Sequence, residues 1–145
     1  MVAVRNRFNI REHRDGDSVL IDDQTLLTKA IEARENAYCP YSKFPVGAAL
    51  LCVDGTVYTG VNVENAVNGL SLCAERVALF KAISEGKREF TKIAVACNAE
   101  HCQPCGACRQ VLYEHAPDLE ILMGNPEGTF KRTTIRDLLP EAFSL

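Results

Sequence analysis

Three cysteines and one glutamate stand at spacings that could form a metal-assisted hydrolytic site. Glu75 follows Cys73 by two residues, and Cys105 and Cys108 share a C-x-x-C motif that begins after thirty-one intervening residues. Three thiolates can hold a tetrahedral zinc ion and leave its fourth position open to water, whereas a structural site takes four protein ligands. A carboxylate next to that position can move protons at the water. The pattern therefore predicts one zinc ion per chain, with the three cysteines as ligands and Glu75 as the proton carrier.

Cys102 leaves a second set of ligands open. It lies three residues before Cys105, so two C-x-x-C motifs overlap between residues 102 and 108. A fourth thiolate would close the site and favour a zinc-stabilised binding module without catalytic activity. Pro104 stiffens the approach of Cys102, and Glu75 would then have no task, so the three-thiolate site is preferred. The remaining cysteines lie in or near apolar runs and are expected to be free, small, buried side chains: Cys39, Cys52 and Cys97.

The pattern of apolar residues predicts the elements that position these groups. Helices are expected from Asp23, as N-cap, to a point before Pro40, and over residues 74–85, 106–114 and, briefly, 135–139. Strands are expected over residues 46–53, 56–63, 93–97, 119–123 and 130–133, with Asp54 and Gly55 as a hairpin turn. This order predicts a three-layer α/β/α sandwich around one mixed, five-stranded sheet. Cys73 and Cys105 would then stand at helix starts, where the helix dipole lowers a thiol pKa.

Several longer segments resemble the small, homotetrameric cytidine deaminases. In chain order they are YSKFPVGAA at 41–49, NVENA at 62–66, CAER at 73–76, PCGACRQ at 104–110 and LLPEAF at 138–143. A glutamate two residues after one ligand, followed by P-C-x-x-C, is the signature of zinc deaminases. The resemblance runs from about residue 26 to the C-terminus. It implies the cytidine deaminase fold and the hydrolysis of cytidine and 2′-deoxycytidine to uridine and 2′-deoxyuridine, with release of ammonia, in pyrimidine salvage.

The resemblance also implies roles for particular side chains. Glu75 would take a proton from the water and return it to the ring and to the departing amino group. Arg76 would donate a hydrogen bond to a ligand sulfur and so withdraw negative charge from the metal. Arg109 either assists in the same way or lies on a helix surface.

The substrate contacts follow from the same resemblance. Asn62 and Glu64 would bind the ribose hydroxyls, Phe44 would pack on the base, and Ala74 would line the site. Phe143 would reach into the site of a neighbouring subunit of a homotetramer. An alternative within the enzymes is a deaminase of a blasticidin-type nucleoside antibiotic, although the N-V-E-N segment favours ribose.

Length and composition restrict the remaining possibilities. The 145 residues suit one catalytic domain, expected at 23–145, preceded by a flexible extension at 1–22. The net charge of −3 and the lack of basic runs argue against a nucleic-acid partner and favour a small nucleoside. No apolar stretch approaches the roughly 18 residues of a membrane span, and no secretory signal is visible. Seven cysteines, three of them at ligand spacing, suit a reducing compartment, so a cytoplasmic location is predicted.

Overall fold

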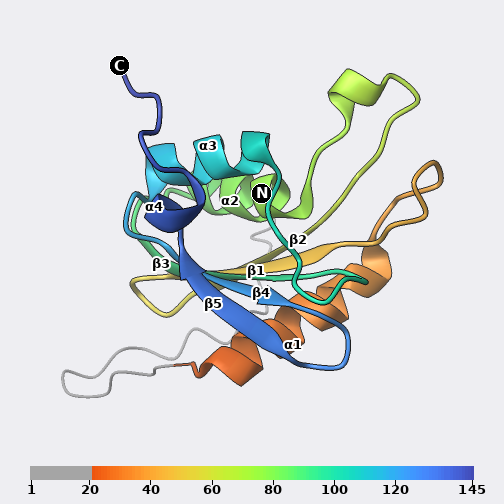
Figure 1. Cartoon of the computed structure of the whole chain (residues 1–145), viewed down its shortest axis with the longest axis horizontal. Coiled ribbons are helices and arrows are strands. Elements are labelled where there is room, and N and C mark those ends of the chain that lie inside the picture. The colour runs from red at the N-terminus through yellow and green to blue at the C-terminus, as the bar shows by residue number, and fades with distance from the viewer. Residues whose placement is uncertain (1–20) are drawn as a thin grey trace, which may run out of the picture.

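A mixed, five-stranded sheet forms the centre of the computed structural model, which describes residues 21–145. The strands lie in the order β2–β1–β3–β4–β5 (Figure 1). Only β3 and β4 run parallel, and the other neighbours are antiparallel. Except for its last two residues, the predicted extension at 1–22 lies outside the described residues. The strand bounds are Gly47–Cys52 for β1, Val57–Val61 for β2, Phe90–Ala96 for β3, Glu120–Gly124 for β4 and Phe130–Thr134 for β5.

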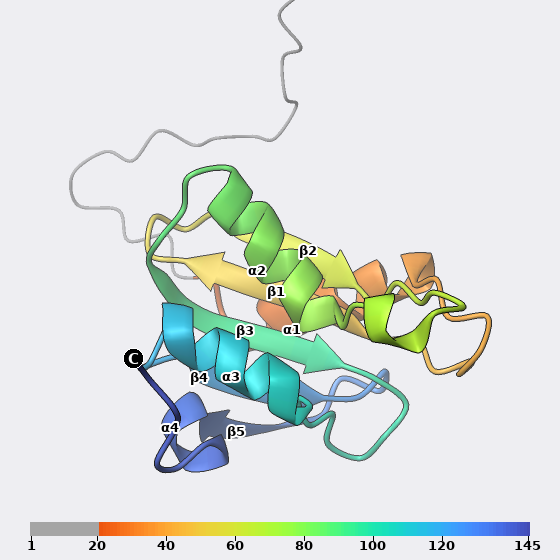
Figure 2. The same ribbon diagram turned by 90° about the horizontal axis from the view of Figure 1, so that it is seen from above.

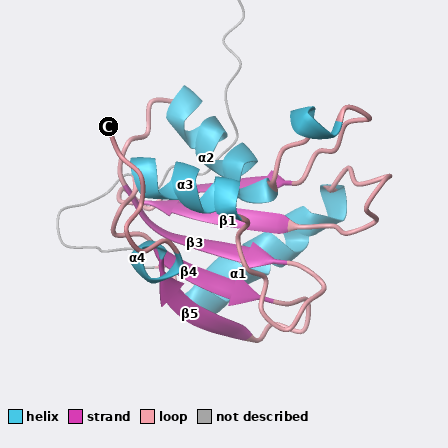
Figure 3. Cartoon of the chain, turned by 45° about the horizontal axis from the view of Figure 1, so that its top comes forward, coloured by secondary structure: helices cyan, strands magenta, loops and turns pink. Residues whose placement is uncertain are grey.

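Helices cover both faces of the sheet and confirm the predicted three-layer sandwich. Helices α2 (Ala74–Ser84) and α3 (Gly106–His115) lie side by side on one face, and α1 (Asp23–Ala33) lies on the other (Figures 2 and 3). Short elements complete the fold: η1 (Arg34–Asn36), η2 (Asn68–Leu70) and α4 (Ile135–Leu138). Because β1 is buried on both faces, alternate residues such as Leu50 and Leu51 join two separate hydrophobic cores.

The start of α1 differs by one residue from the prediction. Asp22, not Asp23, is the N-cap, because its side chain accepts a hydrogen bond of 2.7 Å from the backbone N–H of Thr25. Asp23 is the first helical residue, and its carboxylate pairs instead with Lys92 and Arg132 from the sheet. The two acidic residues therefore have separate tasks, one in capping and one in attaching the helix to the strands.

The predicted second strand ends earlier than expected. Strand β2 stops at Val61, and Val63 forms only isolated bridges, with Tyr38 and with Leu72. Asn62 and Glu64 were predicted to close this strand, but they lie in the irregular segment after it. The segment leaves the sheet here because the backbones of Asn62 and Glu64 bond to the loop before β1 and that of Val63 bonds to Leu72, ahead of α2, rather than to a neighbouring strand.

Gly60 allows α2 to approach β2 closely at the end that carries Cys73. A Cβ atom at Gly60 would lie 2.4 Å from the carbonyl oxygen of Ala74 and 2.5 Å from the backbone nitrogen of Ala78. Both neighbours are backbone atoms of α2, so they can give way only if the helix moves. Gly60 is thus the residue of β2 that fixes where the first metal-ligand candidate sits.

Gly60→Ala is expected to lower the free energy of unfolding by about 3 kcal/mol, because the added methyl group overpacks the helix backbone. Chemical denaturation of the purified variant measures this change. Gly69→Ala is the matched control, since a Cβ atom there would meet nothing within 4 Å. Equal stabilities of the two variants would contradict the close approach as the reason for glycine at position 60.

Candidate metal centre and active-site pocket

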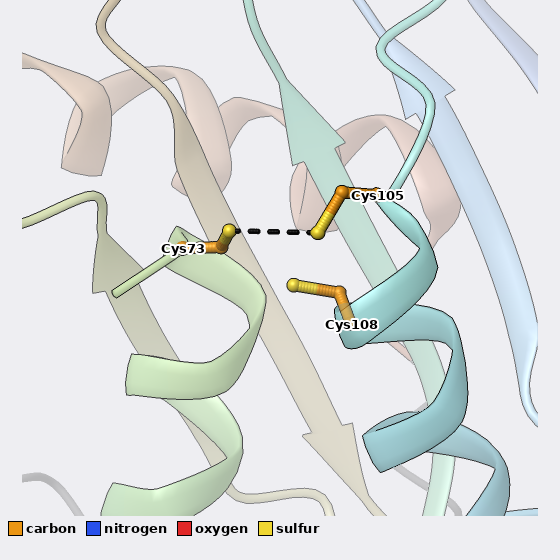
Figure 4. A group of neighbouring side chains, drawn as sticks. All are labelled: Cys73, Cys105 and Cys108. Atoms are coloured by element: carbon orange, nitrogen blue, oxygen red, sulfur yellow. Dashed lines mark hydrogen bonds between the residues drawn. The ribbon is translucent and has the colours of Figure 1, made fainter. Parts of the chain in front are cut away.

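The three predicted ligands meet between the starts of two helices. Cys73 is the N-cap of α2, Cys105 is the N-cap of α3, and Cys108 lies in the first turn of α3. Their sulfurs all lie within 4.8 Å of one another, and those of Cys73 and Cys105 are 3.6 Å apart (Figure 4). A tetrahedral ion with Zn–S bonds of 2.3 Å holds its sulfurs about 3.8 Å apart. The spacing of the three sulfurs therefore suits a zinc ion.

Hydrogen bonds and charge favour a thiolate at Cys73. The pKa of Cys73 is lowered to about 5, first because the Cys108 thiol donates to its sulfur and then because of Arg76. The Arg76 guanidinium donates from Nη2 to the Cys73 sulfur over 3.3 Å, which agrees with the predicted contact. Cys108 keeps its own proton, and its pKa is raised by this hydrogen bond and by burial. Metal binding must displace that proton, since zinc binds thiolates.

Glu75 is buried beside the thiol cluster. Its exposed fraction is 4%, and among residues 21–145 it is the only buried residue with a charged side chain. Burial raises the pKa of Glu75 to about 7, and the negative charge of Cys73 acts in the same direction. A carboxyl group with this pKa can both accept and release a proton near neutral pH. Its position is therefore unlike that of an ordinary surface glutamate in a first helical turn.

A pocket of about 620 Å³ opens in front of Glu75 and the cluster. Its volume lies in the range of small-molecule sites. Four of the five predicted substrate contacts line it together with Glu75: Phe44, Asn62, Glu64 and Ala74. The fifth, Phe143, is not part of its wall, and the exposed fraction of this side chain is 68%. Within one chain, the structure thus brings together all predicted site residues except Phe143.

Asn62 and Glu64 also hold the loop that carries Phe44, which sequence reasoning missed. The Asn62 side chain accepts from the backbone N–H of Val46 over 2.9 Å and donates to the carbonyl of Phe44 over 2.8 Å. Oε1 of Glu64 accepts from the N–H groups of Tyr41 and Ser42 over 3.0 and 3.1 Å. Hydrogen bonds from Ser42 and Tyr41 also lower the pKa of Glu64. The alternation of side chains along a strand predicted that Asn62 and Glu64 lie on the same side. It gave no indication that both bind the loop that carries Phe44.

Cys97 and Cys102 form a disulfide bond, which corrects the expectation that Cys97 is a free thiol. Cys97 is buried as predicted, but it is not free, because the chain turns after β3 and brings the two Cα atoms within 5.4 Å. Cys102 therefore has no free thiol for the metal, and the four-thiolate alternative lacks its fourth ligand. Cys52 is buried and free as expected, whereas Cys39 is only half-buried.

Arg109 acts on the backbone around the cluster. Its guanidinium donates from Nε to the carbonyl of Pro104 over 2.8 Å and from Nη1 to the carbonyl of Leu138 over 2.9 Å. The neighbouring Gln110 donates to the carbonyl of Phe143 over 3.0 Å. These bonds attach the C-terminal segment to α3 and hold the peptide that precedes Cys105. Arg109 therefore follows neither predicted interpretation, because its guanidinium bonds to backbone carbonyls instead of contacting a ligand sulfur or lying free on the helix surface.

Comparison with known proteins agrees with the fold and the metal centre. A family profile described as "cytidine and deoxycytidylate deaminase zinc-binding region" matches residues 20–123. The chain is 52% identical over 126 residues to a cytidine deaminase from Halalkalibacterium halodurans, covering 86% of this chain and 96% of the relative. It is 31% identical over 108 residues to a blasticidin-S deaminase from Bacillus cereus, covering 68% and 76%.

The solved structures lead to the same family. A cytidine deaminase from Burkholderia pseudomallei matches with a TM-score of 0.83 and 50% identity, covering 85% of this chain and 100% of that one. The fold and the three-thiol centre define a zinc-dependent hydrolase that acts on C–N bonds. The chain belongs to the cytidine deaminase family. No helix between residues 21 and 145 combines the length and apolar character that crossing a membrane requires.

Proposed function

We propose that this protein hydrolyses cytidine and 2′-deoxycytidine to uridine and 2′-deoxyuridine, with release of ammonia. The observation that carries the proposal is the burial of Glu75 beside the three thiols, in the wall of a pocket large enough for a nucleoside. Zinc, when bound by Cys73, Cys105 and Cys108, makes a water molecule nucleophilic at neutral pH. Membership of the family supports the assignment of these three ligands.

Glu75 serves as the proton carrier of the reaction. As a carboxylate it accepts a proton from the water that attacks carbon C4 of the cytosine ring. It delivers this proton to N3, then takes the proton of the new C4 hydroxyl and passes it to the amino group, which leaves as ammonia while the oxygen from water becomes the carbonyl oxygen. The raised pKa of Glu75, about 7, supports both halves of this task, because neither protonation state is strongly disfavoured at neutral pH.

The pocket favours a free nucleoside over a polynucleotide. The backbone N–H groups of Tyr41 and Ser42 both donate to Oε1 of Glu64, and Oε2 is suited to accept from a ribose hydroxyl. A carboxylate at this place would also repel a 3′-phosphate. Phe44 lines the same pocket and is suited to pack against the base. A role in pyrimidine salvage in the cytoplasm is part of this proposal.

An assay of the purified protein tests the function directly. We expect one zinc ion per chain by elemental analysis, together with loss of cytosine absorbance and release of one ammonia per cytidine consumed. Bound zinc without turnover would contradict the proposal and favour a non-catalytic module. The 31% identity to a blasticidin-S deaminase makes blasticidin S the competing substrate, and a higher kcat/KM for it than for cytidine would favour that alternative.

The exposed position of Phe143 supports an assembly in which subunits share their sites. Its side chain lies outside the pocket of its own chain, while its backbone carbonyl is held by Gln110. We propose a homotetramer in which Phe143 contacts the substrate in a neighbouring subunit. An exposed aromatic ring on an anchored backbone is suited to fill part of another chain's pocket.

Phe143→Ala is expected to raise KM about tenfold while the backbone bond to Gln110 stays intact, because only the aromatic contact is lost. Steady-state kinetics and light scattering measure KM and the oligomeric state, and Leu145→Ala is the control for another exposed apolar residue of the same tail. Co-assembly with Glu75→Gln subunits should restore the KM of the Phe143→Ala sites, since their neighbours then supply the ring. A monomer with full activity would contradict shared sites.

A further inference from the structure

Cys97 and Cys102 form a second sulfur site in the wall of the same pocket. Both line the pocket, although their exposed fractions are only 3% and 4%. Cys97 directly follows the last residue of β3, and Cys102 lies three residues before Cys105. The five other cysteines are free, and three of them form the metal cluster. The disulfide is therefore the one sulfur feature of the pocket that zinc binding does not use.

We propose that Cys97 and Cys102 are a reversible thiol–disulfide exchange site for small disulfides of the glutathione class. We further propose that the oxidised form retains zinc longer than the reduced form. The second part rests on the zinc centre, and neither part depends on which nucleoside is the substrate.

The chemistry balances with a small disulfide as the oxidant. A thiolate of the protein attacks the small disulfide and releases one small thiol, which leaves a mixed disulfide on the protein. The second protein thiol then displaces the other small thiol and closes the Cys97–Cys102 bond. Two protein thiols are oxidised, one small disulfide is reduced to two thiols, and the two protons pass to those thiols. A small thiol in excess reverses both steps.

The consequence for the metal follows from the place of Cys102 in the chain. The bond attaches the segment before Cys105 to the end of β3, and β3 is held between β1 and β4. On its other side, the peptide before Cys105 is held by Arg109, which donates to the carbonyl of Pro104. Opening the disulfide removes the covalent attachment and leaves only non-covalent ones, among them the hydrogen bond from Arg109. Cys105 can then move away from the cluster more often, and zinc loss becomes faster.

Counting thiols tests the exchange site. The protein is equilibrated in glutathione buffers of increasing oxidation, quenched, denatured with a chelator, alkylated with N-ethylmaleimide and weighed by mass spectrometry. We expect seven alkylated cysteines in the reduced protein and five in the oxidised protein, converting reversibly. The Cys97→Ala variant has one cysteine fewer and cannot close the disulfide. It should therefore show six alkylated cysteines in every buffer that is reducing enough to cleave mixed disulfides with glutathione. Seven alkylated cysteines in every buffer would overturn the proposal, and so would five alkylated cysteines that do not become seven under strong reduction.

The rate of zinc transfer to a chromogenic chelator tests the effect on the metal. We expect the Cys97→Ala/Cys102→Val variant to release zinc about tenfold faster than the oxidised protein. This change is smaller than the about thirtyfold effect that the chain entropy of so short a disulfide loop could give at most. Reduced wild-type protein, freed of reductant under anaerobic conditions, should also release zinc about tenfold faster than the oxidised protein, and this comparison holds even if the variant folds poorly. Cys52→Ala is the control, since Cys52 is a buried free thiol outside the pocket. Equal release rates for oxidised and reduced wild type would overturn this part.

Discussion

Glu75→Gln is expected to lower the turnover of cytidine by about a thousandfold or more, because the variant keeps the shape of the side chain but loses the proton carrier. The protein should still fold and still bind one zinc ion, since Glu75 is not one of the three ligands. Its free energy of unfolding near neutral pH should not fall, because a neutral amide replaces a carboxyl group whose ionisation is opposed by burial. Single-turnover kinetics and elemental analysis measure the two quantities separately.

Glu85→Gln is the matched control for this variant. Glu85 belongs to the same helix, as its C-cap, and accepts a hydrogen bond of 2.7 Å from the Tyr58 hydroxyl. Glutamine can still accept that bond, so the control should keep wild-type kinetics. Activity of Glu75→Gln within tenfold of wild type would show that another group moves the protons, and the mechanism proposed above would be wrong.

Cys105→Ala is expected to lose zinc and stability together. The cluster joins the start of α2 to the start of α3, so a metal ion held there connects two helices that share one face of the sheet. With free zinc at about a thousand times the dissociation constant, binding adds about 4 kcal/mol to the free energy of unfolding. The variant should lack this contribution and be inactive. Chemical denaturation with and without zinc measures the difference.

Zinc-free wild-type protein provides the reference for this loss. Cys105→Ala should unfold at nearly the same denaturant concentration as wild type stripped of metal, and added zinc should not shift its midpoint. Cys39→Ala, which removes a free thiol outside the cluster, should keep both zinc and the shift. Stoichiometric zinc in Cys105→Ala would show that the assigned set of ligands is wrong.

Much of the fold and the metal centre could be predicted because the signals are local. A continuous apolar run marks β1, and Asp54 with Gly55 marks the turn that follows it. Cys105 and Cys108 point to the same side, because α3 begins directly after Cys105 and three residues span nearly one helical turn. The element order then led to the three-layer sandwich, since each helix must bury its apolar stripe on the sheet.

The sequence by itself thus determined most of the elements and the two segments of the site, Cys-x-Glu and C-x-x-C, because each is set by neighbours a few residues apart. The tertiary structure decided the pairings that a loop or turn separates. It placed the side chains of Asn62 and Glu64 on the loop that carries Phe44, and it joined Cys97 to Cys102 across a turn. It also left Phe143 outside the pocket of its own chain. Such pairings depend on how loops return to the sheet, and spacing along the chain does not encode the distance between two side chains once a loop intervenes.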